Sequence, residues 1–201
     1  APEIAPRLEP AGRYDGSFLA RASHFTGDID AHELAWAGDK LWVVNTLFSC
    51  LCTLHEDFSF VPRWRPPFVT SLAPEDRCHL NGVAMGPDER GMLSPQYVTA
   101  LAETDTHEGW RPNKATSGCL IHVPTGSTVA RGFAMPHSPR LHQRRIWMLD
   151  SGTGRLVVVD PTTAGVETVA ELPGYARGLA FHESLAFVGL SKIRETAVFG
   201  G

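Results

Sequence analysis

Four polar residues recur along the chain at intervals that could bring them to one point in a folded protein. They are His32, Asn81, His137 and Arg177, separated by 49, 56 and 40 residues. Each opens a similar stretch of a short apolar segment, a polar turn and a second apolar run. Imidazole and amide groups suit a divalent metal, whereas guanidinium suits a carboxylate or phosphate. We therefore expect a site with metal ligands His32, His137 and Asn81, in which Asn81 and Arg177 can also bind a polar ligand.

The residues two places earlier extend this candidate set. They are Asp30, His79, Met135 and Tyr175. Side chains two residues apart share one face of a strand, so we expect Asp30 and His79 to lie one layer away and to contribute to ligand binding. Histidines with a carboxylate suit zinc or iron, whereas Asp with Asn suits calcium. The alternative is a polar lining that binds only water and backbone carbonyls.

A second candidate site lies in the polar loop at 102–118. Glu103, Asp105 and His107 place two carboxylates and an imidazole within five residues, and Glu103 or Asp105 could act in general acid–base catalysis. A solvated loop is the alternative interpretation. The sequence contains no Gly-x-Ser-x-Gly, His-Glu-x-x-His or P-loop motif that would indicate another chemistry.

The repeat also predicts the elements that position these residues. Strand-rich repeats of about 40–50 residues are typical of β-propeller blades. The sequence contains 19 glycines and 15 prolines, which interrupt it too often for long helices. We therefore expect an all-β fold, a β-propeller of four-stranded antiparallel blades, with residues 1–16 as a tail or linker and 17–201 as the propeller. The expected blades span 28–67, 77–134, 135–173 and, in part, 175–201.

The number of blades leaves two architectures open. Four blades could close into a small ring if a strand at 18–25 paired with the half blade at 175–190, which would remove the exposed edges. Otherwise the chain is an incomplete six-bladed propeller. We favour the incomplete propeller, because the chain stops in the middle of a blade.

Composition narrows the possible partners. The net charge is −4 and no basic bias appears, so we expect neither nucleic acid nor membrane as a partner. A small anionic or polar molecule, or another protein, remains possible. We expect a cytoplasmic protein with four reduced, half-buried cysteines, while secretion and paired cysteines stay open.

Two resemblances support the propeller. The run His-Leu-Asn-Gly-Val-Ala at 79–84, followed by a Gly-Pro-Asp turn and Tyr-Val-Thr at 97–99, remotely resembles the inner strand of the gluconolactonase, paraoxonase and strictosidine synthase superfamily. That resemblance implies a six-bladed propeller and a hydrolase- or lactonase-like activity.

The second resemblance covers most of the chain. The segments 25–30, 45–51, 60–68, 74–82, 135–140 and 189–192 look like a bacterial family of conserved hypothetical proteins, sometimes found beside tetratricopeptide repeats. Members are longer at both ends, which also implies an incomplete propeller. We expect a propeller that binds a small polar ligand, with a non-catalytic interaction or scaffold propeller as the alternative.

Overall fold

The computed structural model describes residues 7, 12–14, 16–20 and 22–191, which form three four-stranded antiparallel sheets and one two-stranded sheet. The first sheet contains β1 (Ala31–Ala37), β2 (Lys40–Asn45), β3 (Cys50–His55) and β4 (Phe58–Trp64). The second contains β5 (Leu80–Pro87), β6 (Leu93–Ala100), β7 (Gly118–His122) and β8 (Thr128–Phe133). The third contains β9 (Pro136–His142), β10 (Arg145–Asp150), β11 (Arg155–Val159) and β12 (Val166–Glu171), and the fourth contains β13 (Tyr175–His182) and β14 (Leu185–Ser191).

The predicted all-β fold of four-stranded antiparallel blades is confirmed. Each sheet is a meander in which consecutive strands are neighbours. The described residues also hold short 3₁₀ turns at Arg111–Asn113 and Ser151–Thr153. No helix among them is long and apolar enough to span a membrane.

The blades pack face to face, and this explains why their middle strands are apolar on both sides. In the third sheet, Ile146 and Met148 of β10 and Val157 of β11 are buried. They pack against Leu120 and Phe133 of the second sheet. β-branched and aliphatic side chains fit such a pleated surface, and burial between two sheets removes the alternation seen in half-exposed strands.

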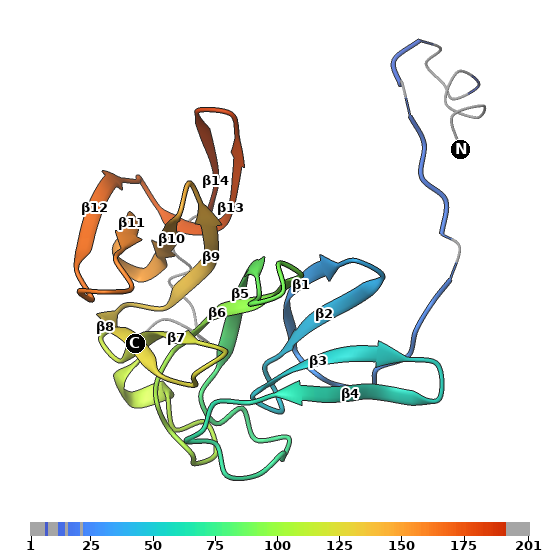
Figure 1. Ribbon diagram of the computed structural model, residues 1–201, viewed down its shortest axis with the longest axis horizontal. Helices are drawn as coiled ribbons and strands as arrows, with labels where there is room; N and C mark the ends of the chain where they lie inside the picture. The colour runs from blue at the N-terminus through green and yellow to red at the C-terminus, as the bar shows by residue number, and fades with distance from the viewer. Residues whose placement is uncertain (1–6, 8–11, 15, 21, 192–201) are drawn as a thin grey trace.

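The first strand of every sheet lies at the centre of the arrangement. β1 contacts β5, β5 contacts β9 and β9 contacts β13, so the four inner strands form a continuous row. Figure 1 shows the sheets fanning outward from this row, with β4 and β12 at the periphery. The start of each inner strand therefore lies close to the start of its neighbour.

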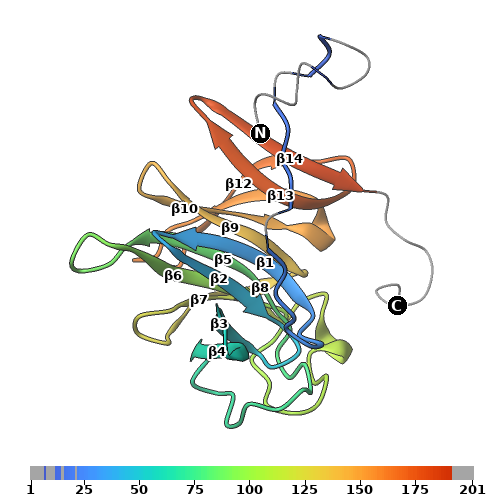
Figure 2. The ribbon, with the colours of Figure 1, turned by 90° about the vertical axis from the view of Figure 1, so that its right-hand side faces the viewer.

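The strand predicted at 18–25 is wrong. Residues 16–20 and 22–28 form no strand, and Phe18, Leu19 and Phe25 are largely exposed. His24 Nε2 lies 2.9 Å from the Ser59 carbonyl oxygen of β4, which holds this segment beside the first sheet. On the N-terminal side of this contact the chain runs away from the first sheet (Figures 1 and 2), and the segment does not pair with β14. Most of the predicted tail at 1–16, and residues 192–201 of the last blade, lie outside the described residues.

The four cysteines are free thiols in the structure. All four are fully buried, where the sequence had suggested half-buried positions. Cys50 and Cys52 lie on β3, and burial raises the pKa of Cys78 to about 12. These thiols therefore act as small apolar groups in the core.

Candidate ligand site at the centre of the blades

Each inner strand carries an irregularity where its repeated polar residue lies. The register shifts fall between Ala31 and Leu34 in β1, Leu80 and Gly82 in β5, and Ala176 and Leu179 in β13. In β9 the shift lies opposite Trp147 and Leu149. A β-bulge leaves a residue outside the hydrogen-bond ladder and redirects its side chain. His32, Asn81 and Arg177 are therefore released from pairing, whereas His137 pairs with Leu149 and lies directly before the bulge of β9.

The residues just before these strands have a left-handed backbone. The φ angles are 48° at Asp30, 51° at His79 and 51° at Met135. These residues precede β1, β5 and β9 rather than belonging to them, so the expectation that they share a strand face is wrong. Such a conformation is uncommon for residues other than glycine and costs on the order of 1 kcal/mol. Its repetition in three blades indicates a common entry turn.

These entry turns orient two of the imidazoles. His32 Nδ1 lies 3.1 Å from the Asp30 carbonyl oxygen, and His137 Nδ1 lies 2.8 Å from the Met135 carbonyl oxygen. A carbonyl can only accept a hydrogen bond, so Nδ1 carries the proton in both rings. Thr46 supports this tautomer, because its hydroxyl donates to the Leu80 carbonyl and so accepts from His32. In the neutral ring, Nε2 is then the acceptor.

Both imidazoles are held in the neutral form. Burial lowers the pKa of His137 to about 3, with a further contribution from the nearby positive charge of Arg177. Burial also lowers the pKa of His32, and His79 adds to this effect. At neutral pH each ring therefore offers an uncharged Nε2 acceptor.

Asn81 joins the second and third blades. Thr99 Oγ1 donates to Asn81 Oδ1 at 2.8 Å, which orients the amide so that Nδ2 faces His137. Asn81 Nδ2 is 3.4 Å from His137 Nε2, at the long limit of a hydrogen bond. Both residues are buried.

His79 is held by a carboxylate that the sequence analysis did not identify. Asp76 Oδ2 accepts from His79 Nδ1 at 2.7 Å and from Trp110 Nε1 at 2.9 Å. The His79 ring centroid lies 4.8 Å from that of His32 and 4.3 Å from that of Trp110. A signal existed, since a tryptophan in a polar loop needs a partner for its N–H when it is buried.

Arg177 is an unpaired cation beside this cluster. It is exposed on β13 and makes no hydrogen bond or ion pair with any described residue. Its charge nevertheless lowers the pKa of His32 and His137, and it opposes the rise that burial causes in the pKa of Tyr175. The N–H of its neighbour Gly178 donates to Ser138 Oγ of β9 at 3.0 Å, so Arg177 lies beside the inner end of β9. We call His32, His79, Asn81, His137 and Arg177 the central group.

The expected metal ligands are only partly gathered. Asn81 contacts His137, whereas His32 contacts His79. Asp30 is exposed, although its charge is close enough to act on the pKa of His32. In the described part of the chain, no three His, Cys, Asp or Glu side chains are grouped to hold a metal ion.

The acid–base candidates of the long loop have other partners. Glu103 pairs with Arg131 at 2.5 Å, and Asp105 pairs with Arg77 at 2.7 Å. Hydrogen bonds from Thr70, and then Arg77, lower the pKa of Asp105 to about 2. His107 is exposed. These contacts fasten the loop to β8 and to the segment that precedes β5, and none of them involves the central group.

A half-buried ion pair lies directly beside the site and connects all four inner strands. Glu33, next to His32 on β1, contacts Arg140 of β9 at 2.5 Å and accepts the Val83 N–H of β5 at 3.0 Å. Arg140 Nε donates to the Leu179 carbonyl of β13 at 2.9 Å. We call this pair the inter-blade ion pair.

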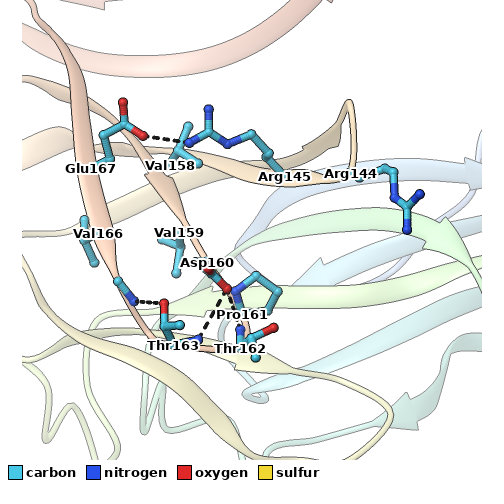
Figure 3. A pocket seen from close by; sticks show the side chains of 11 residues that line it. Arg144, Arg145, Val158, Val159, Asp160, Pro161, Thr162, Thr163, Val166 and Glu167 are labelled. Carbon is cyan, nitrogen blue, oxygen red and sulfur yellow. Dashed lines mark hydrogen bonds and ion pairs between the residues drawn. The ribbon is translucent and has the colours of Figure 1, made fainter.

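A hollow of 520 Å³ lies elsewhere, at the outer end of the third sheet. Figure 3 shows Asp160, Thr162 and Thr163 at the β11–β12 turn, with Arg145 paired to Glu167 at 2.6 Å. Its lining residues belong to β10–β12 and their turns, away from the central group.

Comparison with known proteins shows the family. The chain matches the family described as "Domain of unknown function (DUF4915)" over residues 1–201, and it belongs to that family. No curated protein matches. A solved structure titled "Streptogramin B lyase structure" is similar at 9% identity and a TM-score of 0.38. The match covers 76% of this chain and 59% of that one, so the chain spans less than two thirds of that structure's length.

Proposed function

We propose that the central group of this DUF4915 member binds a small polar molecule. The observation that carries the proposal is the pair of neutral imidazoles whose Nδ1 atoms are fixed by the carbonyls of Asp30 and Met135. Two such rings on different strands provide preorganised Nε2 acceptors, and Asn81 provides a donor beside one of them. A divalent metal is a second ligand to test, because metal-binding histidines are oriented by the same kind of carbonyl contact.

The finer proposal is a hydrolase-like reaction, and the Asp76–His79 pair favours it. A carboxylate on Nδ1 fixes the tautomer of an imidazole and stabilises the cation that forms when Nε2 takes a proton. His79 is therefore the group that we expect to act as general base. A bell-shaped or sigmoidal pH profile for ester or lactone hydrolysis, lost in Asp76→Asn, would support this step.

Binding can be tested with a panel of small polar metabolites and with Zn²⁺ and Ca²⁺, measured by thermal shift and confirmed by calorimetry. We expect at least one ligand whose affinity falls about 10–100-fold in His137→Asn. His122→Asn is the matched control, because His122 lies on β7 and contacts Thr125 rather than the central group. If every ligand binds equally to wild type and His137→Asn, the proposal is wrong.

A further inference from the structure

We propose that the ligand of the central group is a hydroxycarboxylate, whose carboxylate pairs with Arg177 and whose hydroxyls donate to His32 and His137. This inference rests on the proposed function and deepens it by naming the ligand class. It depends on three features of the site: an unpaired guanidinium, neighbouring carboxylates that already have partners, and a neutral imidazole, His137, whose Nε2 accepts only a long hydrogen bond from the described residues.

The first feature is that, within the described part of the chain, Arg177 lacks the carboxylate partner that six other arginines have. Six arginines of the described chain are held by carboxylates, namely Arg77, Arg111, Arg131, Arg140, Arg145 and Arg155. Arg177 has no such partner among the described residues, although it lies near a buried site. A guanidinium matches a carboxylate geometrically and can bind both of its oxygens.

The second feature is that the nearby acidic residues are already engaged. Glu33 is paired with Arg140 at 2.5 Å, and Asp76 is hydrogen-bonded to His79 at 2.7 Å. Asp30 is exposed and makes no ion pair with Arg177. The charge of Arg177 is therefore left to attract an anion from outside the chain.

The third feature is the uncharged acceptors beside this cation. His137 Nε2 has only the long 3.4 Å contact with Asn81 Nδ2. A ligand hydroxyl can donate to an imidazole Nε2 and accept from the Asn81 amide, which a bare carboxylate cannot do. A simple anion would satisfy Arg177 but would add no donor to these acceptors.

A matched set of four-carbon compounds separates the two requirements. Threonate carries a carboxylate and hydroxyls, butyrate carries only the carboxylate, and threitol carries only hydroxyls. We expect calorimetry to show threonate binding about tenfold or more tightly than either analogue, because threitol lacks the charged hydrogen bonds to Arg177 and butyrate lacks hydroxyl donors for the imidazoles. Arg177→Gln should weaken threonate binding about tenfold and leave threitol unchanged. Arg144→Gln is the matched control, because Arg144 is also exposed and unpaired among the described residues but lies at the outer hollow.

The outcomes are distinct. Equal binding of threonate and threitol, or an unchanged threonate affinity in Arg177→Gln, would overturn the role of the cation. Equal binding of threonate and butyrate would overturn the role of the imidazoles. If none of the three binds, the hydroxycarboxylate is wrong. The wider proposal of a polar ligand is then decided separately by the metabolite panel and His137→Asn.

Discussion

Replacing Arg140 by methionine should lower the free energy of unfolding more than any surface substitution does. Methionine keeps much of the aliphatic stem but removes the guanidinium that faces Glu33. The Glu33 side chain is only 15% exposed, so its charge would remain in a poorly solvated place without a partner. The hydrogen bond from Arg140 Nε to the Leu179 carbonyl would also be lost.

The expected cost follows from the burial of the pair. Removing one partner of a buried ion pair typically costs about 3–5 kcal/mol. Arg140 is 32% exposed, so we take the lower end, about 3 kcal/mol. For a chain of this size, that loss corresponds to a fall in Tm of about 6–12 °C. The variant Glu33→Gln should cost less, about 1–2 kcal/mol, because the amide oxygen can still accept from Val83 N–H.

Urea unfolding of wild type, both single variants and the double variant measures these terms. The double variant should lose less stability than the sum of the singles, because the unpaired charge is gone. Burial already raises the pKa of Glu33, and losing Arg140 should raise it further. The cost of Arg140→Met should therefore shrink as pH falls through that raised pKa, since the folded state then binds a proton. A loss below about 1 kcal/mol, or one independent of pH, would refute this account.

Three further predictions follow from single residues. His137 is neutral when folded because its pKa is about 3, so the free energy of unfolding should fall by about 1.4 kcal/mol per pH unit as the pH falls from about 6.5. In urea unfolding from pH 8 to 4, the free energy of unfolding of His137→Asn should depend less steeply on pH. An unchanged pH dependence would contradict the burial of this ring. In Gly82→Ala, the new Cβ would lie 2.5 Å from Pro139 Cδ, so we expect calorimetric melts to show a loss of about 1–3 kcal/mol, whereas Gly16→Ala, with no atom within 4 Å, should be nearly neutral. Trp110→Phe removes the N–H that donates to Asp76 and should cost about 1–3 kcal/mol in denaturant unfolding; wild-type stability in this variant would show that the contact is dispensable.

The fold could be predicted because the repeat reports directly on packing. Runs such as Ile146–Leu149 are apolar at every position, which is what a strand between two sheets requires. The strand prediction at 18–25 was wrong because the apolar pattern of this segment does not report on packing. Its apolar residues suggested a strand, but a strand also needs a paired neighbour, and no local pattern shows whether one exists.

The candidate site was only partly predictable. Aligning the repeats named Asn81 and His137, which the structure places in contact. It could not name Asp76 or Trp110, because they come from connections that have no counterpart in the other blades. The left-handed entry turns were also missed, because Met135 carries no side-chain signal for a positive φ, and the tendency of Asp30 and His79 to adopt one is too weak to predict it alone.

The bulges in the inner strands have a consequence for how such a site can change over time. A residue held in a regular ladder is constrained by its cross-strand neighbours, so most replacements disturb pairing. The residues of the bulges are released from that constraint in all four sheets. An exposed bulge residue such as Arg177 can therefore change with little penalty to folding, whereas Glu33 in the β1 bulge keeps the strands in place through its contact with Arg140. Relatives with the same architecture can thus acquire different ligands by exchanging a few side chains at one end of each blade.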